Sequence, residues 1–511
     1  MQTSNQAIDA VESYSPAEER FNRRRRTVGL WLAPAVLLVL LVLPMPLSVA
    51  GHRMAAIMGL VVVLWMTEAL PMAVTAMLGP MLAVIFGVAD ARSALAPFAD
   101  PIIFLFIGSF ILAEAMFVHG VDRRIAFTAL SSPFVGSSAI RVLVVYAAVA
   151  TVLSMWISNT ATTAMMFPIG LSIVNHLMRV APRDETSRQS VRQFALGLML
   201  LTSFGASVGG MATPVGTPPN LIGIGMLERI AHVRISFFQW MALGVPIVVL
   251  LFGFLVVLFS STARGLRVGE GSGDLVREEL RRLGPLSPAE RNVLVAFGIT
   301  VVLWVAPGLF TIGGWDETAF ARGYAKAMPE GIAAMAGAML LFVLPVDWRA
   351  RRFTITWDQA VRIDWGIVLL YGGGLAIGGL AFSTGLADAL GRGITAWLPS
   401  HSSFVLTALF TATAIVLSEA TSNTASANMI VPVAIAVAQA AGVRPVEPAL
   451  GATLGASMGF MMPISTAPNA IVYSSGFIPI TAMMRYGIAL DVVAFVLIVA
   501  AVTLAGPLLF Q

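Results

Sequence analysis

Two copies of the tripeptide Ser-Asn-Thr, at residues 158–160 and 422–424, are the part of the sequence best suited to chemistry. A further serine lies four residues before each copy, and a proline lies ten residues after the serine of each copy. Amide and hydroxyl side chains both donate and accept hydrogen bonds. They can therefore donate to a carboxylate, and their oxygens are the hard ligands that a cation such as Na⁺ prefers.

A second motif follows each copy and has the form Gly-x-x-x-Pro-x-x-Thr-x-Pro-Asn. It occupies residues 210–220 in the first half of the chain and 459–469 in the second half. One Ser-Asn-Thr would be expected by chance in a long chain, but two copies, each with its own downstream motif, indicate an internal repeat. The repeated residues are therefore our candidates for a functional site.

The composition predicts an all-α polytopic membrane protein. The chain has 511 residues, of which 58% are hydrophobic and 11% charged, whereas soluble domains have about 25% charged residues. Apolar runs of about 20 residues, enough to cross a bilayer, recur along it. Cysteine is absent and the five histidines are scattered, so the sequence indicates no disulfide, no thiolate or histidine metal site and no organic cofactor. The arginines are placed to set topology, so we expect no nucleic-acid partner.

The positions of the basic residues predict the topology. Four arginines at 23–26 precede the first apolar run and place the N-terminus in the cytoplasm. We expect about eleven transmembrane helices and two re-entrant hairpins, with the C-terminus outside. The expected spans lie at about 28–49, 54–71, 72–89, 101–119, 193–226, 237–261, 292–311, 330–346, 364–384, 445–475 and 484–508, and the hairpins at about 142–178 and 402–440. Residues 1–27 are expected to form a disordered cytoplasmic tail.

An odd number of spans separates the two motifs, so the halves form an inverted-topology repeat, whose site is expected near the bilayer midplane. The first repeat covers 28–262, a charged cytoplasmic connector 263–291, and the second repeat 292–511. The half-helix that begins at each Ser-Asn-Thr offers unpaired N–H groups and a positive dipole end to an anion. No Lys or Arg lies near either motif, so cations and helix dipoles must offset the charge of an anionic substrate.

A simpler interpretation applies to single residues. Ser and Thr in membrane helices commonly bond to the backbone or to neighbouring helices, but packing alone does not require two amides at related positions. Glu68, Glu114 and Glu419 lie in or beside apolar runs, where ionisable groups suggest function. The counterpart of Glu419 in the first half is Met155. We favour a structural role for Glu419 over one in biasing a cation site or carrying a proton.

The sequence resembles the divalent anion:sodium symporters, the dicarboxylate/citrate transporter family, over roughly residues 28–510. The doubled Ser-Asn-Thr carries this resemblance, together with the segments 65–71, 104–113, 283–290 and 365–374. The resemblance implies a homodimer that works by an elevator mechanism. A scaffold domain (28–135 and 292–395) would hold the dimer interface, and a transport domain (141–262 and 402–511) would move across the membrane.

The resemblance also implies the residues of the site. The first Na⁺ site would use Ser154, Ser158, Asn159 and the backbone around Gly216. The second would use Ser418, Thr421, Asn423 and the backbone around Ser465. The substrate carboxylates would contact Asn159, Thr160, Asn423 and Thr424, with Thr217 and Thr466 nearby. The second downstream motif departs from the family pattern at Ser465 and Ala467.

The resulting function is Na⁺-coupled uptake of a C4-dicarboxylate such as succinate, malate or fumarate through a bacterial inner membrane. Substrate exchange, proton coupling, and citrate or sulfate as cargo remain open alternatives. A channel would not need a closed site of paired Asn-Thr clamps. An enzyme would need a catalytic dyad or metal ligands within the membrane, and the sequence offers neither, so we expect a transporter and not an enzyme.

Overall fold

The computed structural model describes residues 16–180, 182, 184–264, 266, 270–398 and 401–510, and these residues are almost entirely helical. The helices of the first half are α2 (Pro16–Val42), α3 (Val49–Thr67), α4 (Met72–Ile85), α5 (Ala91–Leu95), η1 (Ala96–Ala99), α6 (Pro101–Val118), α7 (Val121–Leu130), α8 (Ala139–Ser154), α9 (Asn159–Val180), α10 (Glu185–Gly210), α11 (Pro218–Ala231), α12 (Phe237–Ser260) and η2 (Ser261–Ala263). The connector contains α13 (Glu270–Arg282).

The second half begins with α14 (Pro288–Ile312), α15 (Ala319–Ala327) and α16 (Glu330–Val343), followed by a two-stranded hairpin of β1 (Pro345–Asp347) and β2 (Arg352–Phe353). Its remaining helices are α17 (Trp357–Ala360), α18 (Trp365–Ser383), α19 (Leu386–Thr395), α20 (Ser403–Ala420), α21 (Asn423–Ala440), α22 (Val446–Gly455), α23 (Ala467–Tyr473) and α24 (Ile480–Leu509). Neither the β-hairpin nor the short helix α15 was expected from the sequence.

The number of membrane-crossing helices agrees with the expectation of about eleven. Within the described residues, ten helices are long and apolar enough to span a bilayer, and an eleventh is added if α15 and α16, bent by 67° at their junction, form one span. The set differs in detail. Two expected spans, 72–89 and 445–475, are not among them, because α4 has only 14 residues and α22 and α23 are short helices separated by a loop. Helices α9 and α20, which were expected as parts of the hairpins, are each long enough to cross. Re-entry of the two hairpins therefore stays a prediction.

The start of the first helix corrects one expectation. The tail was expected to extend to residue 27, but α2 begins at Pro16 and contains the arginine run. Within this extension Arg25 forms an ion pair with the carboxylate of Glu68 at 2.6 Å. Only residues 1–15 of the expected tail lie outside the described residues.

The two halves repeat one order of elements. In each half a kinked helix pair (α6–α7, α18–α19) is followed by a helical hairpin (α8–α9, α20–α21), a helix broken by a loop (α10–α11, α22–α23) and a long final helix (α12, α24). Both kinks occur at a glycine with positive φ, Gly120 at 69° and Gly385 at 79°, a conformation that other residues rarely adopt.

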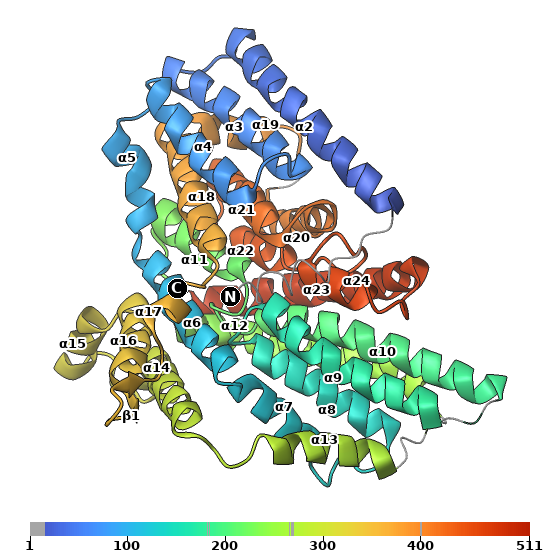
Figure 1. Cartoon of the computed structure of the whole chain (residues 1–511). Coiled ribbons are helices and arrows are strands. Elements are labelled where there is room, and N and C mark those ends of the chain that lie inside the picture. Colours follow the sequence, from blue (N-terminus) through green and yellow to red (C-terminus); the bar gives the residue numbers. More distant parts are fainter. Residues whose placement is uncertain are drawn as a thin grey trace.

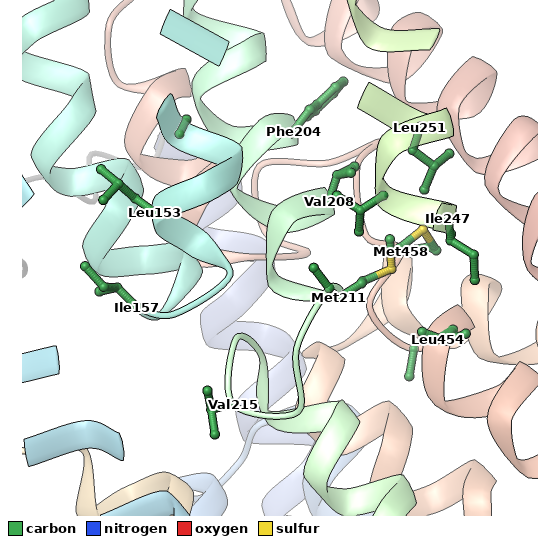
Figure 2. Close-up of a cluster of buried hydrophobic side chains, with 14 of the residues drawn as sticks. Leu153, Ile157, Phe204, Val208, Met211, Val215, Ile247, Leu251, Leu454 and Met458 are labelled. Carbon is green, nitrogen blue, oxygen red and sulfur yellow. The ribbon is translucent and has the colours of Figure 1, made fainter. Parts of the chain in front are cut away.

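The halves interlock around the broken helices (Figure 1). Helix α11 of the first half packs against α21 and α22 of the second, and α23 of the second half packs against α9 and α10 of the first. Apolar side chains fill the space around the breaks, as Figure 2 shows for Met211 on the first loop, Ile247 on α12, Leu454 near the end of α22 and Met458 in the loop after it. Leu153 and Ile157, which flank the turn of the first hairpin, belong to the same buried core.

Candidate anion and cation site

The serines of the two Ser-Asn-Thr motifs begin helices. Ser158 Oγ accepts a hydrogen bond from the Ala161 amide at 3.3 Å, and Ser422 Oγ accepts one from the Ala425 amide at 3.3 Å. Serine is a favoured N-cap because its oxygen satisfies one of the unpaired N–H groups of the first turn. The polar tips therefore start α9 and α21 at a defined residue, and they leave the other N–H groups of each first turn available.

The asparagines that follow are held by the serines at the ends of α8 and α20. Ser154 Oγ donates to Asn159 Oδ1 at 2.7 Å. Ser418 Oγ lies 2.7 Å from Asn423 Oδ1 and 2.8 Å from the Ala456 carbonyl, and these two acceptors share its single proton. Both serines are completely buried. Because Oδ1 of each amide faces its serine, Nδ2 is the end that can donate to another group. The Nδ2 of Asn423 has one long contact, 3.4 Å to the Ser457 carbonyl.

Oxygen atoms converge around two glycines in the first half. A methyl group on Gly216 would lie 2.5 Å from the Gly210 carbonyl oxygen and 2.9 Å from the Ser154 carbonyl oxygen. One on Gly210 would overlap Asn159 Oδ1 and lie 3.1 Å from the Gly216 carbonyl oxygen. Glycine is required here so that these oxygens can approach one another. Neutral carbonyl, amide and hydroxyl oxygens in such a cluster fit Na⁺, a hard cation.

The second half has a related cluster of oxygen atoms, in which more of the hydroxyl groups already donate hydrogen bonds to other residues. A methyl group on Gly459 would lie 3.1 Å from Asn423 Oδ1 and 3.2 Å from the Ser418 carbonyl oxygen. Thr421 Oγ1 donates to the Trp65 carbonyl at 3.2 Å, and Ser465 Oγ donates to Glu419 Oε2 at 2.7 Å. Both hydroxyl oxygens keep acceptor capacity, but their positions are set by these partners.

The last asparagine of each downstream motif closes the loop that breaks the helix. Asn220 Nδ2 donates to the carbonyls of Gly210 at 2.9 Å and Thr213 at 2.7 Å. Asn469 Nδ2 donates to the carbonyls of Gly459 and Met462, both at 3.0 Å. We did not expect these two residues to act on the site, although their equivalent places in the repeat were visible in the sequence. Their hydrogen bonds hold the loops that carry Gly216 and Ser465.

The two tips and their downstream motifs line one cavity of about 2140 Å³. All six residues expected to contact the substrate line it, namely Asn159, Thr160, Thr217, Asn423, Thr424 and Thr466. Of the expected cation ligands, Ser158 and Ser465 also line it, whereas Ser154, Ser418 and Thr421 are buried behind its wall. The cavity continues past Glu114 and reaches Arg123, Arg362 and the α13 residue Glu279. The structure thus brings the expected site together, with four of the candidate cation ligands, Ser154, Gly216, Ser418 and Thr421, buried and outside the cavity lining.

Comparison with known proteins gives a consistent result. Residues 24–511 match the family model described as the sodium:sulfate symporter transmembrane region. The chain is 33% identical over 486 residues to a sodium-dependent dicarboxylate transporter, SdcS, of Staphylococcus saprophyticus, covering 94% of this chain and 91% of that protein. It is 31% identical to SdcS of Staphylococcus aureus (strain USA300), with the same coverage.

Among solved structures, the YdaH transporter of Alcanivorax borkumensis shares the fold, with a TM-score of 0.52, 13% identity, and coverage of 83% of this chain and 89% of that one. That likeness concerns the fold alone, whereas the family match spans nearly the whole chain. The chain therefore belongs to the sodium:sulfate symporter family of membrane transporters.

Proposed function

We propose that the protein takes up C4-dicarboxylates such as succinate, malate and fumarate, coupled to Na⁺. One observation carries the proposal: the cavity lining contributed by the tips and their downstream motifs contains hydroxyl, amide and apolar groups and no charged residue. A doubly charged anion bound there needs counter-charge, which bound cations and the N-termini of α9 and α21 would supply. The name of the SdcS relatives, sodium-dependent dicarboxylate transporter, supports this choice of cation and cargo.

The amides of Asn159 and Asn423 would couple the two ligands. In each amide Oδ1 faces the buried serine and the cation cluster, so Nδ2 is available to a carboxylate in the cavity. A cation bound to Oδ1 holds the amide in place and strengthens its N–H groups as donors. Half of the candidate cation ligands are buried and outside the cavity lining, whereas all the anion ligands line it, so we expect Na⁺ to bind first and the dicarboxylate second.

The movement would be of the elevator type, within a homodimer in the bacterial inner membrane. The elements of the proposed transport domain, residues 141–262 and 402–511, interlock through α11 and α23, which supports their moving as one body against the scaffold, residues 28–135 and 292–395. With the N-terminus in the cytoplasm, α13 is cytoplasmic. The cavity extends to α13, which corresponds to an inward-facing state.

Uptake by purified protein in proteoliposomes tests the coupling. We expect radiolabelled succinate to accumulate under an inward Na⁺ gradient and not under a matched K⁺ gradient. Equal accumulation with K⁺ would rule out Na⁺ symport.

A substrate panel of malate, fumarate, citrate and sulfate, each with and without Na⁺, identifies the cargo. Preloading with unlabelled succinate detects exchange, and an imposed pH gradient without Na⁺ detects proton coupling. We expect C4-dicarboxylates to compete with succinate more strongly than citrate or sulfate.

A further inference from the structure

Two buried carboxyl groups meet beside the second Ser-Asn-Thr motif. Glu419 lies in the last turn of α20, next to Ser418, and Asp491 lies within α24. Their exposed fractions are 7% and 6%. Their carboxyl groups are within hydrogen-bonding reach of each other. Helices α20 and α24 thus bring two acidic side chains together inside the apolar part of the molecule.

The hydrogen bonds of the two groups differ. The oxygens of Glu419 accept from the amides of Phe460 at 2.5 Å and Met461 at 2.8 Å and from Ser465 Oγ at 2.7 Å. Both oxygens of Asp491 are buried and have no hydrogen-bond donor among the described residues. A carboxylate cannot donate to another carboxylate. Asp491 is therefore a buried acceptor whose polar neighbour is another acid.

No basic group within the described residues compensates this pair. Helices α12 and α21, which pack nearby, contain no ionisable side chain. On α22, Glu447 faces Arg444 at 3.8 Å, and on α24 Arg485 is exposed. Two adjacent anions at low dielectric repel strongly, and buried charges require pairing. The pair therefore needs to be neutralised, either by a proton or by a bound cation.

The first half shows that packing does not require these acids. Two glycines occupy related places against the loops that break the helices. A methyl group added to Gly244 of α12 would lie 2.7 Å from the Met211 carbonyl oxygen of the first loop, and one added to Gly487 of α24 would lie 2.7 Å from the Met461 amide nitrogen of the second loop. In this register Asp491, four residues after Gly487, corresponds to Val248, four residues after Gly244. Glu419 corresponds to Met155. The corresponding positions in the first half therefore both carry apolar residues.

We propose that Glu419 and Asp491 bind a Na⁺ ion of their own, a third cation site beyond those at the two Ser-Asn-Thr motifs. Asp491 offers both oxygens to the ion, and Glu419, held by its three donors, offers a fixed anionic oxygen. A single proton would serve only one oxygen of Asp491 and leave the other without a partner. The Ser465 hydroxyl links Glu419 to the loop of the second Ser-Asn-Thr cation site, so the added ion would order that loop. This inference rests on the proposed Na⁺ coupling.

Counting bound ions tests the site. Equilibrium binding of ²²Na⁺ to the purified full chain should give about three ions per chain. The double variant Glu419→Met/Asp491→Val carries the residues of the first half and should bind about two ions per chain. The number of Na⁺ ions transported per succinate, measured from reversal potentials, should fall in this variant from about three to about two. The matched control Met155→Leu/Val248→Leu should keep three ions. Asp491→Asn, which preserves shape, should also bind two and allows the test to stand if the double variant does not fold.

Two bound ions in the unchanged protein, or an unchanged number in Asp491→Asn, would overturn the third site. The third site would also be overturned if the unchanged protein bound two ions and Na⁺-driven succinate entry acidified the vesicle lumen. The acid pair would then carry a proton and not a Na⁺ ion. These failures leave uptake dependent on Na⁺. Failure of the proposed function is different, because succinate uptake would then proceed equally in K⁺ in every variant.

Discussion

Replacing Gly210 by alanine should damage the first cation site far more than replacing Gly459 damages the second. The two glycines occupy the same place in the repeat. The new methyl group on Gly210 would overlap Asn159 Oδ1, whereas the one on Gly459 would stay 3.1 Å from Asn423 Oδ1. The first contact forces Asn159 away from its position, and the second requires a shift of only a few tenths of an ångström. The same substitution thus gives a matched comparison between the halves.

The magnitude follows from the hydrogen bond that Gly210→Ala disrupts. Moving Asn159 Oδ1 leaves the buried Ser154 hydroxyl, now 2.7 Å from it, without that acceptor. An unsatisfied buried group costs about 1–3 kcal/mol, which corresponds to a loss of about 5- to 150-fold in Na⁺ affinity. For Gly459→Ala we expect less than about a threefold loss, or roughly 0.6 kcal/mol.

The assay is the Na⁺ concentration that gives half-maximal succinate uptake, with ²²Na⁺ binding to the same purified variants. Thermal unfolding in detergent is the control, because a general loss of folding would lower both readouts without discriminating between sites. Equal shifts for the two variants, or unchanged Na⁺ dependence in Gly210→Ala, would refute the assignment of Asn159 to the first cation site.

Four other substitutions test separate parts of the structure. Asn159→Ala and Asn423→Ala should each abolish uptake while leaving gel-filtration behaviour unchanged, and normal uptake by either variant would contradict the site. Asn220→Ala removes the donor to the carbonyls of Gly210 and Thr213 and should destabilise the fold by about 2–5 kcal/mol, seen as a lower Tm; an unchanged Tm would show that the loop does not depend on this amide. Burial raises the pKa of Asp122, in the short helix α7 outside the apolar spans, from 3.8 to about 6. The unfolded chain releases this proton at lower pH than the folded one, so stability falls as pH rises from about 4 to 6. Asp122→Asn should therefore raise stability by about 3 kcal/mol at pH 8 and leave it unchanged below pH 4; an equal effect at both pH values would contradict the burial of this carboxyl.

Much of the helical framework could be predicted from the sequence. The expected hairpins at 142–178 and 402–440 correspond to α8–α9 and α20–α21, with turns at the Ser-Asn-Thr motifs. The breaks after Gly210 and after Gly455 fall where Gly, Pro and Thr recur. The start of α2 was placed too late, because hydropathy marks the apolar part of a helix and not its first charged turns. The β-hairpin had no signal in a pattern dominated by apolar runs.

The sequence by itself determined the repeat, the apolar helices and the residues that can bind a cation or an anion, because these depend on residue type and on spacing along one chain. Only the tertiary structure decided which partners each residue has. Asn159 and Asn423 are local to their serines, but Asn469 accepts from Ser203 and Glu419 meets Asp491 only because helices distant in sequence pack together. Contacts between residues that are far apart in the chain produce no periodic pattern in the sequence. We noted Glu419 in the sequence as an isolated acid and did not single out Asp491. Only the packing of α20 against α24 placed the two side by side, with no hydrogen-bond donor to Asp491 among the described residues.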